Sequence, residues 1–182
     1  VHDTAMFKRL VVTGPAGSGK STLAEAVAAR IGVPFVELDA VFWGPAWTPT
    51  PRDAFRDKVA RLAAEEAWTI GANYSAVRDV LWARAEALVW LDLPLSLILG
   101  RLLRRTLRRI VRREELWSGN RETWRDAFFS RGSLFPYAIR QHNRFRRELP
   151  AALAAPENQH LSVARLTTPL AVADWLAALP PG

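Results

Sequence analysis

One eight-residue segment constrains the fold of this chain more than any other feature. Residues 14–21 read Gly-Pro-Ala-Gly-Ser-Gly-Lys-Ser and match the pattern GxxxxGK[ST] at every fixed position. The segment follows the apolar run Leu10–Val12 and precedes the helix-like stretch Thr22–Ile31. Its glycines let successive backbone N–H groups turn inward around a phosphate, and the following helix adds its positive N-terminal end. The segment therefore predicts a phosphate-binding loop between a strand and a helix.

The pattern also assigns tasks to individual residues. Lys20 is expected to reach the β- and γ-phosphate oxygens, and Ser21 is expected to ligate Mg²⁺. The predicted cofactors are ATP and Mg²⁺, because no NKxD segment that would read guanine is present in the chain. The predicted nucleotide-binding residues here are Gly14, Pro15, Ala16, Gly17, Ser18, Gly19, Lys20, Ser21 and Thr22. The alternative interpretation is a glycine-rich turn that binds no ligand.

Length and composition favour a single domain. The chain has 182 residues, 49% of them hydrophobic, which is enough for one core and short for two. We therefore expect one domain over residues 1–182, with no role for residues 1–5. No apolar run is long enough to span a membrane and no signal peptide is evident, so we expect a cytoplasmic protein without a membrane partner. With no cysteine and only three scattered histidines, disulfides are excluded and a zinc cluster is not indicated.

The charge of the chain indicates anionic partners. The net charge is +7, and most of the positive residues are arginines. Such a balance favours nucleotide phosphates or nucleic acid as ligands.

Hydrophobic runs alternate with helix-like segments along the chain, which predicts an α/β fold with a parallel sheet covered by helices. The predicted strands are residues 7–13, 34–39, 68–72, 87–92 and 160–166. The predicted helices are residues 20–31, 51–66, 76–83, 95–113, 121–130, 137–149 and 170–178, and residues 150–158 are predicted to form a loop.

Ligands of such sheets bind beyond the carboxyl ends of the strands, so polar residues at these ends are the candidate site. Asp39 follows the second strand and is predicted to orient or deprotonate an acceptor hydroxyl; the alternative is a carboxylate that caps a turn. Asn73 and Tyr74 follow the third strand, where they either hydrogen-bond the phosphate or acceptor or form a plain turn. Asp92 follows the fourth strand and is a second metal candidate, with a structural acceptor of backbone hydrogen bonds as the alternative.

The segment after Asp39 carries the candidate acceptor pocket. Trp43 and Trp47 either line this pocket or pack beneath a loop. Arg52 and Arg56 lie one helical turn apart and either face an anionic acceptor or remain solvated. Thr168, after the last strand, either contacts the adenine edge through its backbone or begins a helix.

Arginines recur at helical spacing between residues 101 and 113, with aliphatic residues on the opposite side of the helix. We predict a mobile lid over about residues 101–131 whose guanidinium groups cover the transferring phosphoryl group. The alternatives are a nucleic-acid surface and a solvated helix face.

Several motifs together resemble the small P-loop kinases that include adenylate, shikimate and gluconate kinases, and in particular the adenylate-kinase-like or DNA topology modulation protein group. They are GPAGSGKST, LDAVFW with the later PRDAF, GANYS, LDLP, and the arginine helix leading into LWSGNRE, all between residue 7 and about residue 149. The resemblance implies a P-loop NTPase fold, a three-layer α/β/α arrangement of five parallel strands in the order 2-3-1-4-5. It also implies an acceptor-binding segment after the second strand, a lid after the fourth, and nucleotide contacts from Arg101 and Arg105, with Arg108 and Arg109 near enough to substitute.

The chain departs from its relatives at one position. They commonly read DGNY where this chain reads Gly71-Ala72-Asn73-Tyr74, so a carboxylate that would hold Mg²⁺ through water is missing. Either Asp39 and Asp92 share the metal, or turnover is impaired. Nucleotide binding is expected to survive this loss better than catalysis, because the loop amides and Lys20 supply most phosphate contacts.

Two functions follow from these features. The first is transfer of the γ-phosphoryl group of Mg-ATP to a small acceptor, such as a nucleoside monophosphate or another hydroxyl-bearing or anionic metabolite, by a monomer or homodimer. The predicted catalytic residues are Lys20, Asp39, Arg101 and Arg105. The alternative is a nucleotide-dependent protein that binds nucleic acid or acts as a regulatory ATPase.

Overall fold

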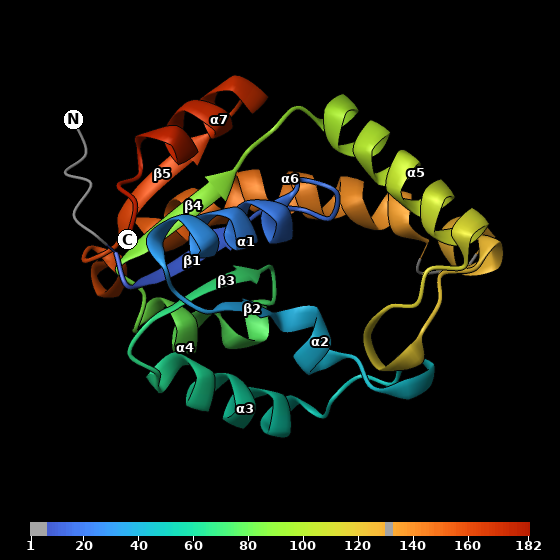
Figure 1. Ribbon diagram of the computed structural model, residues 1–182, viewed down its shortest axis with the longest axis horizontal. Helices are drawn as coiled ribbons and strands as arrows, with labels where there is room; N and C mark the ends of the chain where they lie inside the picture. The colour runs from blue at the N-terminus through green and yellow to red at the C-terminus, as the bar shows by residue number, and fades with distance from the viewer. Residues whose placement is uncertain (1–6, 130–132) are drawn as a thin grey trace.

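The computed structural model describes residues 7–129 and 133–182, and its centre is a five-stranded parallel sheet (Figure 1). The strands lie in the order β2-β3-β1-β4-β5, as expected for the resembled fold. They are β1 (Arg9–Thr13), β2 (Phe35–Glu37), β3 (Trp68–Ala72), β4 (Ala87–Leu91) and β5 (Ser162–Leu166). β1 therefore lies between β3 and β4, and its carboxyl end opens at the middle of the sheet.

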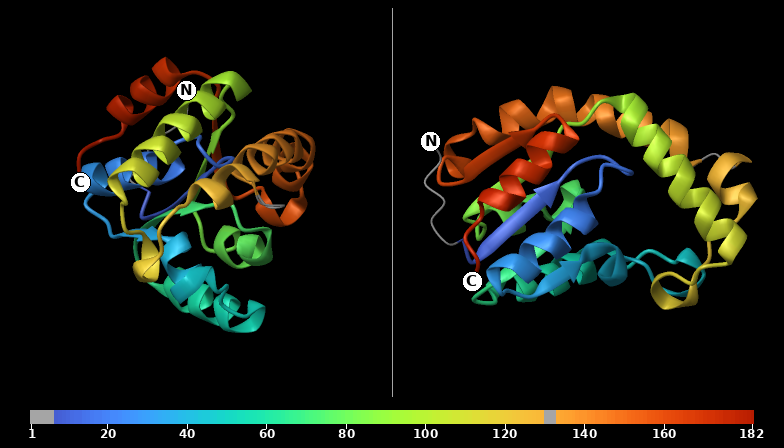
Figure 2. Two further views of the ribbon diagram at one scale, coloured as in Figure 1. Left: turned by 90° about the vertical axis from the view of Figure 1, so that its right-hand side faces the viewer. Right: turned by 45° about the horizontal axis from the view of Figure 1, so that its top comes forward.

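Helices cover both faces of the sheet, which gives three layers (Figures 1 and 2). The longer helices are α1 (Lys20–Ile31), α3 (Arg52–Ala64), α5 (Leu95–Arg112), α6 (Leu134–Leu153) and α7 (Pro169–Ala178). Shorter elements are α2 (Leu38–Phe42), α4 (Arg78–Trp82), the 3-10 turns η1 (Pro45–Trp47), η2 (Ser75–Val77), η3 (Trp117–Gly119) and η5 (Pro156–Asn158), and the π-helical turn η4 (Arg125–Phe129).

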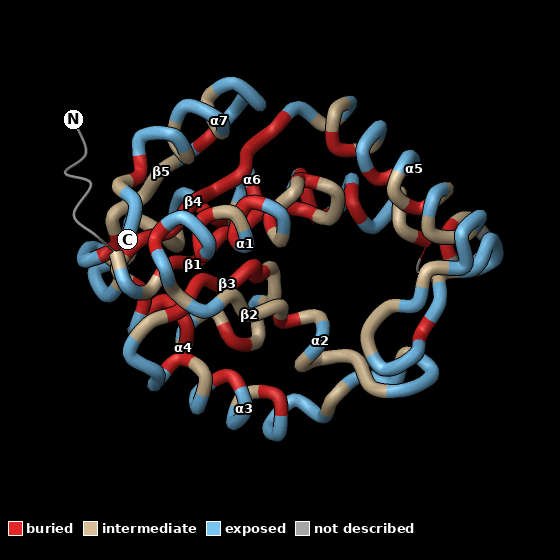
Figure 3. Tube along the Cα trace, in the orientation of Figure 1, coloured by how far each residue is buried: buried red, intermediate tan, exposed pale blue. Residues whose placement is uncertain are grey.

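Successive side chains of each strand point to opposite faces of the sheet, and this divides the core into two clusters. Leu10 and Val12 of β1 pack with α1 and α7, whereas Val11 packs with α3, α4 and α6. Successive side chains of a strand point to opposite faces, so an unbroken apolar strand builds both clusters at once. The burial-coloured trace shows the result, with buried strands and exposed outer turns of α5 (Figure 3).

Several predicted boundaries differ from the structure, and three of the differences bear on the site or on the lid. β2 ends at Glu37, and Asp39 lies in the short helix α2 that follows it. α6 continues through Pro150 to Leu153, so the predicted loop begins later than expected. Pro150 has no N–H to donate to the carbonyl oxygen of Arg146, so the helix continues for one more turn without that hydrogen bond. A helix is predicted over residues 121–130, and the structure shows only η4 within that range. Residue 130, the last of the predicted helix, lies outside the described residues.

α5 and α6 extend beyond the sheet and form an arch whose tip meets the segment after α2 (Figures 1 and 2). The predicted lid, about residues 101–131, comprises most of α5 and the tip of the arch but not α6, and residues 130 and 131 lie outside the described residues. Among the residues that the structure describes, no helix has the length and apolarity needed to cross a membrane.

The two-sided core gives a direct stability test. Leu88 of β4 is fully buried, whereas Leu170 is 70% exposed. Leu88→Ala should lower the free energy of unfolding by about 2–5 kcal/mol, because it removes buried methyl groups and leaves a cavity. Leu170→Ala should change it by less than about 0.5 kcal/mol. Urea unfolding of both variants checks the prediction, and equal effects would contradict the assignment of Leu88 to the core.

Candidate active site

The phosphate loop joins the end of β1 to the start of α1. Gly17 and Gly19 have φ values of 84° and 93°, in the left-handed region that favours glycine. A Cβ atom on Gly17 would also lie 2.8 Å from the carbonyl oxygen of Ile98. The loop therefore needs glycine at these positions both for its conformation and for its close approach to α5.

Lys20 is the buried cation of the site. Lys20 is only 9% exposed, and burial lowers the pKa of its ammonium group. The charge of Asp39 opposes this shift, and the charge of Arg105 adds to it. A buried ammonium group needs an anionic partner, and the phosphates of a bound nucleotide would supply one.

A carboxylate that the sequence analysis missed lies beside Ser21. Glu37, the last residue of β2, accepts a hydrogen bond from Ser21, while burial raises the pKa of the Glu37 carboxyl above its ordinary value. Within the part of the chain that the structure describes, its Oε1 atom is buried and has no hydrogen-bond partner. In the sequence, the only sign of a role for Glu37 is its position two residues before Asp39. The surroundings of Glu37 depend on how β2 pairs with β3, which the sequence does not display.

Glu37 lies opposite Gly71 in the paired strands β2 and β3. A Cβ atom on Gly71 would lie 3.4 Å from the Cα atom of Ser21, so a side chain at position 71 would point toward the first turn of α1. Glu37 thus lies on the strand beside Gly71, with its carboxyl group next to Ser21. A hydroxyl and a carboxylate oxygen are ligands that suit Mg²⁺, and the unpartnered Oε1 atom fits such a group.

Asp39 and Tyr74 form a hydrogen-bonded pair at the carboxyl ends of β2 and β3. The Tyr74 hydroxyl donates to Oδ1 of Asp39. Burial, followed by the charge of Asp39 and this hydrogen bond, raises the pKa of Tyr74, so its hydroxyl stays protonated. The pair fixes one oxygen of Asp39.

Some arginines of α5 face the site, and others are exposed on the outer side of the helix. Arg101 donates from Nη1 to the carbonyl oxygen of Ser18 over 3.2 Å. Arg105 is half-buried, and its Nε atom finds no hydrogen-bond partner among the described residues. Arg109 bonds Glu122 over 2.8 Å. Arg101, Arg105 and Arg109 therefore recur every four residues, as expected for one helix face.

The expected contribution of Arg108 is wrong. Its exposed side chain pairs with Glu114 over 3.1 Å, and Arg108 does not line the cavity described below. One residue along a helix turns a side chain by about 100°, so Arg109 takes the inward position instead.

The tip of the arch is docked on the segment after α2. Oδ1 of the buried Asn120 accepts from the backbone N–H of Trp47 over 2.9 Å, and its Nδ2 donates to the carbonyl oxygen of Gly44. Trp47 packs edge-on against Trp43 and Trp117. The lid is therefore closed in this structure.

The closed arch encloses a cavity of about 700 Å³ in front of the phosphate loop. Lys20, Asp39 and Arg105 all line it, together with the aromatic rings of the segment after α2. The other lining residues are Ala16, Phe42, Trp43, Trp47, Asn73, Tyr74, Arg109, Trp117, Glu122, Ala127, Leu134 and Tyr137.

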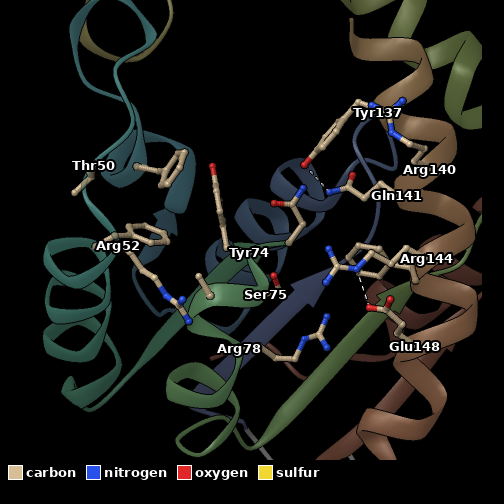
Figure 4. A pocket seen from close by; sticks show the side chains of 15 residues that line it. Thr50, Arg52, Tyr74, Ser75, Arg78, Tyr137, Arg140, Gln141, Arg144 and Glu148 are labelled. Atoms are coloured by element: carbon tan, nitrogen blue, oxygen red, sulfur yellow. Dashed lines mark hydrogen bonds and ion pairs between the residues drawn. The ribbon is translucent and has the colours of Figure 1, made fainter. Parts of the chain in front are cut away.

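A second cavity of about 650 Å³ lies on the other side of Tyr74 (Figure 4). Arg52 lines it, whereas Arg56 turns away. The expected role of Arg56 in acceptor binding is wrong, because its guanidinium bonds both oxygens of Asp79 and the carbonyl oxygen of Ala76. This ion pair fastens α3 to α4.

The expected metal role of Asp92 is also wrong. This buried carboxylate bonds Nε of Arg146 over 2.6 Å and Nε of Arg165 over 2.9 Å, one oxygen to each arginine. It is thus a structural acceptor, although its donors are side chains rather than the expected backbone groups. No group of three or more His, Cys, Asp or Glu side chains suited to a metal occurs within residues 7–129 and 133–182.

Two further contacts affect the phosphate loop and the last helix. Oε1 of the buried Gln141 accepts from the Ala16 N–H of the loop over 2.8 Å, and its Nε2 donates to Tyr137. Helix periodicity alone gave no signal for this contact, since it joins residues 125 positions apart. The Thr168 side chain caps α7 by accepting from Ala171, which is the expected alternative of a helix start.

The burial of Glu37 predicts a pH-dependent stability. Its raised folded-state pKa contributes stability that is fully present below the ordinary value of 4.5 and is lost as pH rises through the folded-state pKa. Glu37→Gln keeps this side chain neutral, so without nucleotide or metal the variant should be more stable than the wild type at neutral pH, with the difference vanishing toward pH 4.5. Urea midpoints across pH measure this. Exposed Glu65→Gln is the control, and a less stable Glu37→Gln protein at neutral pH would refute the prediction.

The docked lid predicts a change in amide exchange. Asn120→Ala removes both hydrogen bonds to the segment after α2, at a cost of about 1–3 kcal/mol to the docked state. The Trp47 amide should therefore exchange with solvent about ten- to a hundredfold faster. Hydrogen exchange measures this, with the Val12 amide of β1 as the internal control. An unchanged rate at Trp47 would show that Asn120 does not hold the lid.

Comparisons with known proteins agree with this geometry. A model of the family "ATPase family associated with various cellular activities (AAA)" matches residues 10–92, from β1 to Asp92. A cytidylate kinase of Methylococcus capsulatus is 38% identical over 76 residues, which cover 40% of this chain and 34% of that protein. A shikimate kinase of Salinibacter ruber is 30% identical over 109 residues, which cover 52% of this chain and 53% of that protein. The matched part therefore spans between about a third and about half of these two curated relatives.

A solved gluconokinase from Sinorhizobium meliloti 1021 has a similar structure, with a TM-score of 0.53 and 24% sequence identity. The superposition covers 94% of this chain and 90% of that one. It supports the fold independently of the sequence matches. The chain thus has the α/β fold of the small P-loop kinases, and part of it is similar in sequence to cytidylate and shikimate kinases.

Proposed function

We infer that the protein is an ATP-dependent phosphotransferase that moves the γ-phosphoryl group of Mg-ATP to a small acceptor. The observation that carries this inference is the shared cavity of Lys20, Asp39 and Arg105 in front of the phosphate loop. A phosphate-binding cation, a carboxylate suited to a hydroxyl proton and a guanidinium group are the residues that phosphoryl transfer requires.

The phosphate loop holds the donor. Its backbone N–H groups and the N-terminus of α1 bind phosphate oxygens, and Lys20 contacts the β- and γ-phosphates. Because Lys20 is buried, its charge acts in a poorly solvated environment, where it is stronger than in water. Arg101 braces the loop at Ser18.

Ser21 and Glu37 are the residues that would hold Mg²⁺. The ion, when bound, neutralises negative charge on the phosphate oxygens. Glu37 has the unpartnered buried oxygen for this role, and Asp92 does not, because both its oxygens face arginines. The loss of a carboxylate at position 71 is thereby compensated, and we expect turnover rather than nucleotide binding alone.

Asp39 orients the acceptor and receives its proton. Tyr74 occupies Oδ1, so Oδ2 is the oxygen that faces an acceptor hydroxyl. A carboxylate in this position aligns the hydroxyl for attack on the γ-phosphorus and takes the hydroxyl proton as the bond forms.

The lid supplies positive charge and excludes water. Arg105 has a buried Nε atom without a partner among the residues described, and it is available to the transferring phosphoryl group. Docking of Asn120 on the acceptor segment closes the cavity, which protects the phosphoryl group from hydrolysis.

The acceptor class is a small hydroxyl-bearing or anionic metabolite. Homologues named shikimate kinase, cytidylate kinase and gluconokinase support this class without selecting one member. The tryptophan-lined wall of the cavity also suits a planar base, which keeps nucleoside monophosphates among the acceptors to be tested.

Nucleic-acid binding is the second candidate, and the exposed Arg104, Arg108 and Arg112 on the outer side of α5 favour it. The inward arginines of the same helix favour the kinase instead, because Arg105 and Arg109 line the cavity. A low-salt mobility shift with DNA, weakening steeply as salt rises, is the result that would favour the second candidate.

Turnover provides the test of the proposed function. Purified protein with Mg-ATP and a panel of nucleoside monophosphates, sugar acids and alcohols should release ADP with at least one acceptor, and Lys20→Ala should abolish release. Asp39→Asn should lower kcat about 10²–10⁴-fold, since it removes the proton acceptor. The exposed Asp57→Asn on α3 is the matched control and should behave as wild type. Release no greater than that of Lys20→Ala across the panel would refute the proposal.

A further inference from the structure

The second cavity carries an excess of positive charge that the proposed chemistry does not use. Four arginines line it (Arg52, Arg78, Arg140 and Arg144), whereas Glu148 is the single lining carboxylate. Glu148 is already engaged, since it bonds Nε of Arg144 over 2.7 Å and Nη2 of Arg147 over 3.3 Å. Its charge therefore does not balance the other arginines.

Arg78 is the centre of this cluster. It begins α4, is half-buried, and lies over the ring of Trp82 with 5.2 Å between its Cζ atom and the ring centroid. No hydrogen bond or ion pair involves its guanidinium group among the described residues. Figure 4 shows Arg78 and Arg144 side by side, with Arg52 directed into the same space from the opposite wall. Burial, and then the charge of Arg144, lowers the pKa of Arg78.

Several other partly buried arginines of the fold are paired. Arg109 bonds Glu122, Arg56 bonds Asp79, and Arg9 bonds Glu86. Adjacent guanidinium groups repel each other, and partial burial makes their repulsion costlier. An unpaired Arg78 beside Arg144 is thus a site at which a ligand anion gains from charge-assisted hydrogen bonds.

The two cavities share one wall. Phe42, Asn73, Tyr74 and Tyr137 line both of them. Tyr74 bonds Asp39 through its hydroxyl and also lines the cavity of the arginines (Figure 4). One acceptor molecule that passes this wall would place one end at Asp39 and the other at Arg78.

We propose that the cavity around Arg78, Arg144 and Arg52 binds the oxyanion end of the acceptor, a phosphate or a carboxylate group. The acceptor is then an alcohol whose hydroxyl lies at Asp39 while its anionic group lies beyond Tyr74. This assignment rests on the proposed function for the hydroxyl end, whereas anion binding at Arg78 stands on the cavity alone.

Direct binding of inorganic phosphate is the first test. The phosphate loop is saturated with a non-hydrolysable ATP analogue, and phosphate is titrated calorimetrically into the full-length protein. Arg78→Gln should weaken phosphate binding about tenfold or more, because it removes a charge-assisted contact. Arg61→Gln, which removes the same charge from the exposed last turn of α3, should change it less than about twofold. No phosphate binding to the wild type, or equal losses in both variants, would overturn the proposal.

Acceptor selectivity is the second test and distinguishes the two anions. Matched alcohols that carry a phosphate, a carboxylate or a neutral amide at the far end are compared as acceptors. Arg78→Gln should raise the KM of the anionic acceptors about tenfold, with the KM of ATP and the rate with the neutral acceptor unchanged. The anion with the greater rise is the one that the cavity takes. Equal effects on neutral and anionic acceptors would overturn the proposal.

The two tests separate this inference from the proposed function. Arg78-dependent phosphate binding without any turnover would refute the kinase and keep the anion cavity. Turnover that is indifferent to Arg78, with no phosphate bound there, would keep the kinase and refute the cavity.

Discussion

The buried charge of Lys20 is the constraint on which the rest of the site depends. An ammonium group that is almost out of water requires anions, and the fold brings Glu37 and Asp39 toward it from the end of β2. The glycines at positions 17 and 19 make the turn of the phosphate loop sterically possible. The residues that we propose for donor binding, metal binding and acceptor activation thus lie around one cation.

The arginines show how the fold assigns roles to like residues. Arg146 and Arg165 neutralise Asp92, and Arg56 fastens α3 to α4 through Asp79. Arg105 and Arg78 lack such partners among the described residues, and each faces a cavity. Pairing, rather than position in the sequence, therefore separates structural arginines from those available to a ligand. The two available arginines lie on opposite sides of Tyr74, next to the two ends of the proposed acceptor.

Much of the fold could be predicted from the sequence because its signals are local. The phosphate loop, the apolar strands and the arginine face of α5 are each written within a few consecutive residues. The position of Glu37, which we propose as a metal ligand, could not be predicted in this way. Glu37 reaches Ser21 only because β2 pairs with β3 opposite Gly71, and Gln141 reaches Ala16 only through the path of α6. The prediction for Arg108 was wrong for a similar reason. Helix spacing defines which residues share a face, but not which part of the protein that face contacts.

The sequence by itself determined the order of the strands and helices, the loop that binds phosphate and the positions from which the site is built. Backbone geometry and hydrophobic alternation act over short distances, so the residues alone specify them. Only the tertiary structure decided which charges meet. It placed Asp92 between two arginines, brought Glu37 opposite Gly71, and left Arg78 without a partner in the described part of the chain. The physical reason is that an ion pair or a cavity joins residues from different elements, and their distance exists only after the elements have packed.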